Sequence, residues 1–310
     1  MRIVLMGQAP FGAKTLEALL SAGEEIVAVY APAAPPGAKP DPLEEAARVR
    51  GIQHIRPMAL RDDREFDAFV RLAPDLVVLA FVTDIVPIRY FAAAREGALC
   101  YHPSLLPRHR GASAINWALI MGEKATGLTI FRPDAGIDTG PILLQKTVAI
   151  GPRDTAGSLY FERLFPMGVE ALVESVKLLG EGKAQFITQD DSKATYEPRC
   201  DDRVAGIDWN AGGRDIFNLV RGCDPQPGAY ARFRAETVRL YGAEFLPGKS
   251  DAPPGSIAGV DAKGLRIAVA GGELHVAKVR TPSAAKMEAA AWASANDIHP
   301  GDRFDVKSKK

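Results

Sequence analysis

The sequence has little cysteine, few aromatic residues, no long apolar run and no excess of either charge. Cys100, Cys200 and Cys223 are its only cysteines, and their spacing suggests neither a zinc site nor a disulfide framework. Such usage is typical of a reducing compartment and predicts a cytoplasmic protein. No window approaches the roughly 18 apolar residues of a membrane-spanning helix. The apolar run that follows Arg2 is too short for a signal peptide, so we expect no membrane partner.

The charge is balanced, with 38 Lys plus Arg against 38 Asp plus Glu in 310 residues. Proteins that bind nucleic acid usually have more basic than acidic residues, but a net charge of zero does not exclude a local basic patch. Residues 205–310 hold 15 basic and 12 acidic side chains, and residues 1–204 hold 23 and 26. This is only a faint basic bias in the C-terminal part. The length suits two domains, and the 47% hydrophobic content excludes a disordered chain.

The first half of the chain alternates strand-like and helix-like patterns. Arg2–Met6, Glu25–Ala31 and Asp75–Phe81 are apolar runs of strand length, and Ala13–Ser21 carries leucines at helical spacing. This alternation predicts an α/β fold with a mainly parallel, doubly wound, Rossmann-like sheet. Ligands bind such sheets at the carboxyl ends of the strands. We therefore expect the site in the loops that follow Met6, Phe81 and Cys100.

The second half of the chain has a different pattern of apolar and polar residues. A polar stretch without periodicity predicts a connector over residues 186–206. One helix is expected over Arg214–Arg221, followed by several short β-like runs bounded by Gly or Pro, which suggest a small barrel or sandwich. We therefore predict domains at residues 1–185 and 207–306, with a frayed tail at 307–310.

Histidine and aspartate mark two candidate loops. His102 ends the predicted strand GALCY, where an imidazole is well placed for proton transfer, although a buried structural histidine is the alternative. His109 lies between Arg108 and Arg110 and is expected to be a solvated loop residue, while these arginines either face substrate or lie on the surface.

Two aspartates, Asp134 and Asp138, lie in a glycine-rich loop between apolar runs. Gly136 and Gly140 would let the backbone approach a ligand closely, whereas the plain alternative is an Asx turn. The sequence DTG also occurs in aspartic proteases, but a single copy in an α/β chain fits them poorly. No cluster with metal-ligand spacing is visible, so no metal is expected.

The two loops together resemble one family. HPSLLPRHRGASAINW (102–117) followed by DAGIDTGPILLQ (134–145) is similar to the formyltransferases that use 10-formyltetrahydrofolate. The resemblance implies that His102 and Asp138 are the catalytic pair, that residues 1–185 form the catalytic domain and that 10-formyltetrahydrofolate is the formyl donor. It also implies that folate binds at Phe81, Val82, Thr83, Asp84, Ser104, Leu105, Leu106, Pro107, Asp134, Ala135, Gly136 and Ile137.

Cys100 departs from the pattern of most transferases in this family, which have Asn two residues before the catalytic histidine. An amide can donate a hydrogen bond to a developing oxyanion, whereas a thiol is a weak donor. Loss of one such donor costs about 2.7–4 kcal/mol in other acyl-transfer enzymes. The chemistry would then depend more on His102, backbone N–H groups or water.

The formyl acceptor is the open question. The chain most resembles the hydrolase domain of 10-formyltetrahydrofolate dehydrogenase, and it resembles methionyl-tRNA formyltransferase in its two-domain layout. We expect no aldehyde dehydrogenase segment. The loop expected to be basic for tRNA, residues 31–42, contains one lysine, Lys39, offset by Asp41. We therefore expect water or a small amine as acceptor. Formylation of initiator Met-tRNA is the alternative, and a folate-binding module without turnover is a lesser one.

Overall fold

The computed structural model describes residues 1–310 except 33, 35–36, 57–59 and 306–310. The predicted tail at 307–310 and part of the loop 31–42 lie outside the described residues. The chain divides into two compact units. The first unit contains residues 1–111, 127–148 and 162–196, and the second contains residues 112–126, 149–161 and 197–310.

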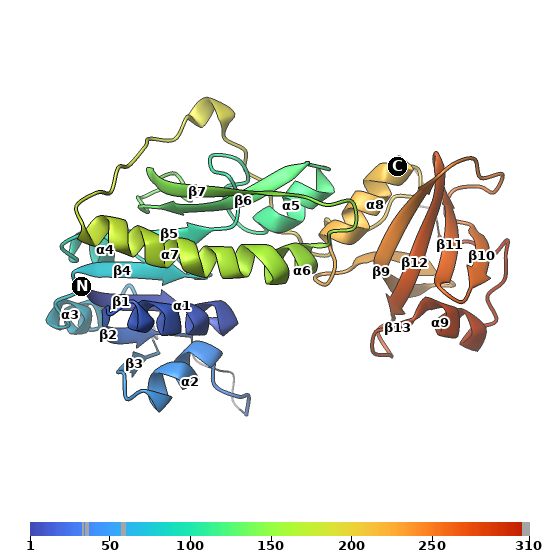
Figure 1. The fold of residues 1–310 in the computed structure, drawn as a ribbon. Coiled ribbons are helices and arrows are strands. Elements are labelled where there is room, and N and C mark those ends of the chain that lie inside the picture. Colours follow the sequence, from blue (N-terminus) through green and yellow to red (C-terminus); the bar gives the residue numbers. More distant parts are fainter. Residues whose placement is uncertain (33, 35–36, 57–59, 306–310) are drawn as a thin grey trace. The chain divides into compact units, whose positions relative to one another are not determined.

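The first unit is built on a seven-stranded sheet in the order β3-β2-β1-β4-β5-β6-β7 (Figure 1). Neighbouring strands from β3 to β5 are parallel, and β6 is antiparallel to β5. The strands are β1 (Arg2–Gly7), β2 (Glu25–Tyr30), β3 (His54–Ile55), β4 (Leu76–Ala80), β5 (Ala98–His102), β6 (Ala125–Phe131) and β7 (Ile142–Ala149). The predicted mainly parallel sheet is confirmed.

Helices cover both faces of this sheet (Figure 1). On one face, α1, α2 and α7 bury residues such as Leu16, Leu43 and Leu172 against the strands. On the other, α3 and α4 contribute Phe69 and Tyr90. The helices are α1 (Ala9–Ser21), α2 (Pro42–Val49), α3 (Asp63–Arg71), α4 (Ile88–Ala92) and α7 (Phe165–Gly180), which follows a π-helix (Tyr160–Leu164); a 3-10 turn covers Asp191–Lys193. In α1, apolar spacing of 3–4 residues puts Leu16 and Leu19 on one buried stripe.

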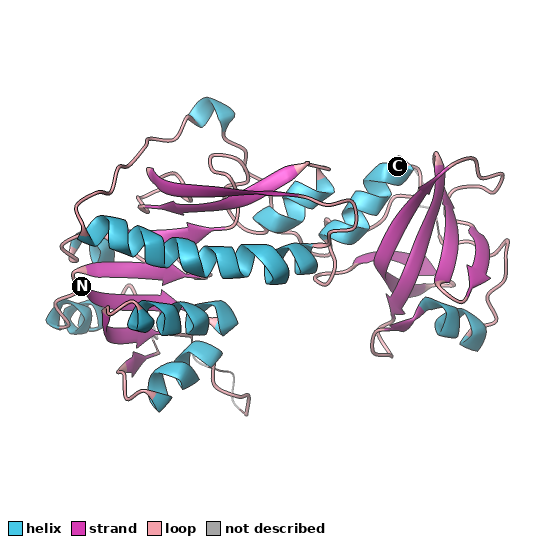
Figure 2. Ribbon diagram, in the orientation of Figure 1, coloured by secondary structure: helices cyan, strands magenta, loops and turns pink. Residues whose placement is uncertain are grey.

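The second unit contains a six-stranded antiparallel sheet, in the order β10-β11-β12-β9-β8 with β13 paired to β12. Figure 2 shows these strands in magenta. Trp209, Phe233 and Phe304 pack together in its core. The predicted β-rich C-terminal part is confirmed, while β8 and α9 were not predicted. Its elements are α5 (Ala114–Ile120), α6 (Ala156–Leu159), α8 (Gly213–Gly222), β8 (Ala229–Phe233), β9 (Glu236–Pro247), β10 (Ile257–Asp261), β11 (Gly264–Val269), β12 (Gly272–Arg280), β13 (Met287–Glu288) and α9 (Ala289–Ala295).

The carboxyl ends of β1, β4 and β5 are adjacent because these strands pair in parallel. Close backbone approach at this edge requires glycine, since a Cβ on Gly7 would lie 2.3 Å from the carbonyl oxygen of Ala80. The loop after β4 begins with Phe81 at φ +64°, which turns the chain sharply out of the sheet. In the described part of the chain, no helix has the length and apolar character needed to cross a membrane.

Candidate active site

The site is built around a histidine–aspartate pair in the first unit. His102 is the last residue of β5 and only 6% exposed, and Asp138 lies in the loop between β6 and β7. Their side chains approach to 3.4 Å between His102 Nδ1 and Asp138 Oδ2. The structure thus brings together two side chains that are 36 positions apart in the sequence.

The other ring nitrogen of His102 fixes the tautomer. His102 Nε2 lies 2.8 Å from the carbonyl oxygen of His109, and because a carbonyl only accepts, Nε2 carries a proton and donates. Nδ1 is then the nitrogen that can exchange a proton with Asp138. His109 itself is buried with φ +55°, so the expectation of a solvated loop residue was wrong. The backbone of His109 is buried because its carbonyl oxygen accepts the hydrogen bond of the buried His102 imidazole.

Asp138 uses one carboxylate oxygen for support. Oδ2 accepts a hydrogen bond from the backbone N–H of Gly111 at 2.7 Å and also faces His102. Among the described residues, none donates a hydrogen bond to Asp138 Oδ1 or forms an ion pair with it. The Asp138 side chain is 17% exposed, more than that of His102. This arrangement leaves Oδ1 as the oxygen that can accept a proton from a bound molecule.

The loop that carries Asp138 is held by local polar contacts. Asp134 Oδ1 accepts hydrogen bonds from the N–H of Gly136 at 2.9 Å and from Thr139 Oγ1 at 2.5 Å. These are the contacts of an Asx-type turn, the structural alternative for Asp134. Gly140 ends the turn where a Cβ would lie 1.8 Å from the carbonyl oxygen of Arg132. Asp134 therefore shapes the loop, while Asp138 reaches the histidine.

The Ser-Leu-Leu-Pro turn is supported by the sheet beneath it. Ser104 is fully buried and donates through Oγ to the carbonyl of Arg108 at 2.6 Å. Thr129 on β6 donates to Ser104 O and accepts from Leu106 N–H. Gln145 on β7 donates to Leu106 O at 2.9 Å. The buried side chains of Ser104 and Leu106 therefore shape the turn, and any contact of theirs with folate would be through the backbone.

Exposed apolar side chains lie on the loops of this edge. Phe81 is 39% exposed, Ile137 is 51% exposed and Ile85 is 75% exposed. Large apolar side chains in solvent often mark a ligand or partner surface when they cluster. The neighbouring Thr83 is tied to the end of β1 by Gln8 Nε2 at 3.4 Å. The loop after β4 thus offers both apolar surface and backbone polar groups.

Cys100 lies two residues before His102 on β5, with its Sγ 3.7 Å from the carbonyl oxygen of Tyr101. Burial raises the pKa of its thiol, and the negative charge of Asp138 raises it further. The protein therefore holds Cys100 as a neutral thiol at physiological pH, because the shift disfavours the thiolate. A neutral thiol is a poor nucleophile and a weak hydrogen-bond donor.

We predict that Cys100→Ser keeps kcat at this site within roughly threefold of wild type, since a hydroxyl replaces the weak donor. The native thiol should also resist iodoacetamide at pH 8 while the protein is folded. Steady-state kinetics and mass spectrometry of the alkylated protein check both points. A loss of about 10³-fold with Cys100→Ser would instead identify a nucleophilic thiolate.

The structure adds two residues of the predicted connector that the sequence did not single out, Gln189 and Thr195. Gln189, in the predicted connector, is 8% exposed and contacts the backbone of Asp138. Arg110 is also buried and pairs with Asp191 at 2.6 Å, so a surface role for this arginine was wrong. Thr195 Oγ1 accepts the N–H of His109 at 2.8 Å. Nothing in the polar stretch 186–206 signalled these contacts, because it has no periodicity.

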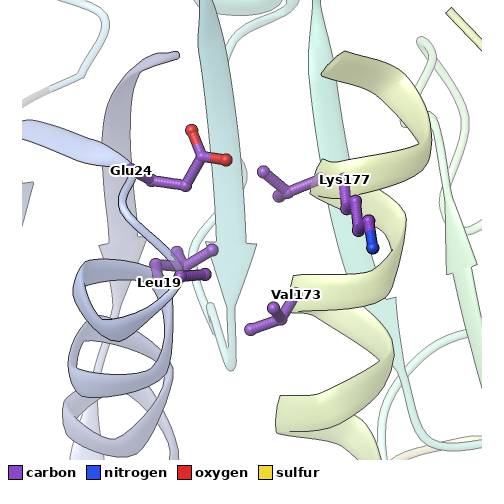
Figure 3. A pocket seen from close by; sticks show the side chains of 6 residues that line it. Leu19, Glu24, Val173 and Lys177 are labelled. Atoms are coloured by element: carbon purple, nitrogen blue, oxygen red, sulfur yellow. The ribbon is translucent and has the colours of Figure 1, made fainter. Parts of the chain in front are cut away.

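A separate pocket of about 300 Å³ lies between α1 and α7 (Figure 3). Glu24 lines it and immediately precedes β2, so the pocket is at the amino end of the parallel strands, away from His102. Glu24 also accepts the N-terminal amine at 2.5 Å. The lining residues are Leu19, Ala22, Glu24, Val173, Val176 and Lys177.

Across the described residues, no group of three or more His, Cys, Asp or Glu side chains could hold a metal ion.

Comparisons with known proteins identify the family of the chain. A family model described as formyl transferase matches residues 1–176, and one described as formyl transferase, C-terminal domain, matches residues 201–297. The mitochondrial 10-formyltetrahydrofolate dehydrogenase of Mus musculus is 39% identical over 79% of this chain, which spans only 27% of that relative. The methionyl-tRNA formyltransferase of Geobacter sulfurreducens is 34% identical over 98% of this chain and 96% of its own.

Among solved structures, HypX from Aquifex aeolicus in complex with tetrahydrofolic acid covers 100% of this chain with 51% of its own length, at a TM-score of 0.68 and 18% identity. At that identity the likeness shows the fold alone. The two family models together span most of the sequence. The chain therefore belongs to the formyl transferase family of enzymes.

Proposed function

We propose that this protein removes the formyl group of 10-formyltetrahydrofolate, passes it to water or a small amine and releases tetrahydrofolate. The observation that carries the proposal is the His102–Asp138 pair, 3.4 Å apart at the carboxyl edge of the sheet. Proton transfer at a carbonyl needs such a pair, with one group to accept a proton and one to orient it. The name of the mouse relative supports 10-formyltetrahydrofolate as the substrate, and the name of the Geobacter relative supports transfer of a formyl group.

In the proposed reaction, the water or amine attacks the formyl carbon and gives its proton to Asp138 Oδ1. Asp138 Oδ2 stays bonded to the Gly111 N–H and faces His102 Nδ1 at 3.4 Å. The tetrahedral intermediate then breaks the bond between the formyl carbon and the folate nitrogen, and that nitrogen receives the proton that Asp138 Oδ1 had accepted. Backbone N–H groups or water stabilise the oxyanion, because the thiol of Cys100 is a weak donor.

Folate would bind along the loops of the same edge. The pterin ring is proposed to lie beside the backbone of residues 81–84 and 134–138 and the turn at 104–107. Exposed Phe81 and Ile137 would cover its apolar faces. We also propose residues 1–185 as the catalytic domain, 186–206 as a connector and 207–306 as a C-terminal domain. The cytoplasmic location expected from the scattered cysteines stays a prediction.

Formylation of initiator Met-tRNA is the second candidate, favoured by the Geobacter relative, which matches over 98% of this chain. The charge of the loop 31–42 counts against it, since Lys39 is offset by Asp41. Asp41 has a structural task, because its carboxylate accepts the N–H of Ala9 at 2.8 Å and of Leu43 at 2.8 Å. Asp41 caps α2 and fixes the turn after β1, so its negative charge belongs to the fold.

The acceptor is tested by three incubations with 10-formyltetrahydrofolate, in which release of tetrahydrofolate is followed. The first contains no acceptor, the second contains charged initiator Met-tRNA and the third contains small amines. Turnover without an acceptor supports the hydrolase, and turnover that requires one acceptor identifies a transferase. Binding of the folate without turnover in any incubation would overturn the proposed function in favour of a binding module.

A further inference from the structure

We propose that Gln189 is a positioning residue for Asp138, an inference that rests on the proposed function. The Gln189 side chain donates from Nε2 to the carbonyl oxygens of Asp138 at 2.9 Å and Gly140 at 2.7 Å. A single amide therefore spans the turn that presents the carboxylate to His102. Both ends of these bonds lie within the first unit.

The orientation of the amide is fixed by its other neighbour. Gln189 Oε1 accepts from Arg110 Nε at 3.2 Å and from Nη2 at 2.8 Å. A guanidinium only donates and a carbonyl only accepts, so the reverse orientation would place like groups together on both sides. Arg110 is in turn held by Asp191 at 2.6 Å. The amide is buried and bonded on both sides, which is the condition for a rigid support.

The same contacts join the two loops of the catalytic pair. Arg110 directly precedes Gly111, whose N–H binds Asp138 Oδ2 at 2.7 Å. The backbone N–H of Arg110 donates to Thr195 O at 3.0 Å, so the segment that carries Gln189 also holds this loop. Gln189 thus bonds directly to the backbone of Asp138. It also bonds to Arg110, which is the residue before Gly111, and the Gly111 N–H binds the Asp138 carboxylate.

Asp138 needs such support because its backbone is strained. Its φ is +56°, a left-handed conformation that non-glycine residues seldom adopt. Such residues persist where the surrounding structure holds them. Without the bond from Gln189, the turn can relax and move the carboxylate away from His102. Misplacement of a catalytic group by about 1 Å can cost roughly 100-fold in rate.

The test replaces Gln189 with methionine, which has similar length and no amide. Gln189→Met should lower kcat about 100-fold and leave KM for 10-formyltetrahydrofolate within about threefold, because it displaces the proton acceptor rather than the folate. Gln189→Asn, too short to span both carbonyls, should show the same split if the methionine variant unfolds. Gln185→Met is the matched control, since Gln185 is exposed on the same segment and should behave as wild type.

A second readout does not depend on turnover. In Gln189→Met, the Asp138 carboxylate should move away from the Gly111 N–H, so hydrogen exchange of this N–H should become at least tenfold faster. The N–H of Val77 in β4 should stay protected. In an Asp138→Asn background, Gln189→Met should lower kcat no further, because both changes act on one group. Full additivity, or unchanged exchange at Gly111, would overturn the inference. Wild-type protein without turnover but with this exchange result would count against the proposed function alone.

Discussion

Replacing Asp138 with asparagine should lower kcat for the proposed release of tetrahydrofolate by about 10³-fold, in the middle of the range of about 10²–10⁴ for loss of a general acid–base group. The amide oxygen can still accept the Gly111 N–H that now binds Oδ2 at 2.7 Å, so the loop should keep its shape. What is lost is the second carboxylate oxygen, Oδ1, which accepts the proton in the proposed reaction, while Oδ2 is the oxygen that faces His102. Steady-state release of tetrahydrofolate measures the effect, and His102→Ala should give a loss of the same order.

The matched control is Asp261→Asn, the same substitution at the exposed last residue of β10 in the second unit. It should leave turnover unchanged. Circular dichroism and thermal unfolding show whether each variant is folded. If folded Asp138→Asn or His102→Ala retained more than about a tenth of wild-type kcat, the assignment of the pair as the catalytic groups would be abandoned.

Replacing Gly140 with alanine should have the second largest effect. The added Cβ would lie 1.8 Å from the carbonyl oxygen of Arg132, so the turn must move. We expect a loss of about 1–3 kcal/mol in the free energy of unfolding, as in other overpacked sites. The turn carries Asp138, so kcat should also fall about 100-fold. Thermal unfolding and steady-state kinetics measure the two effects.

Gly248→Ala separates this steric effect from the general cost of the substitution. Gly248 lies in an exposed loop after β9, and a Cβ there would meet no atom within 4 Å. Its stability and turnover should remain those of wild type. Equal behaviour of the two alanine variants would show that the close approach of Gly140 to Arg132 does not hold the turn.

Local patterns predicted most of the first unit because its strands are buried on both faces. The run Asp75–Phe81 became β4, and GALCY became β5 with His102 at its end. The prediction for the first helix began at Ala13, whereas α1 begins at Ala9. That extra turn is set by Pro10 in its first positions and by the bond from Ala9 N–H to Asp41, which is far along the chain. Such a contact between distant residues has no effect on the periodicity of the sequence.

The sequence by itself determined the apolar strands, the edge of the sheet that carries His102 and the motifs that resemble a family. These follow from local composition, since burial on a sheet selects apolar runs and parallel strands end at one edge. Only the tertiary structure decided that His109 is buried, and that Gln189 supports Asp138 across 51 positions of the chain. Hydrogen bonds between distant loops depend on three-dimensional proximity, which no spacing of residue types encodes.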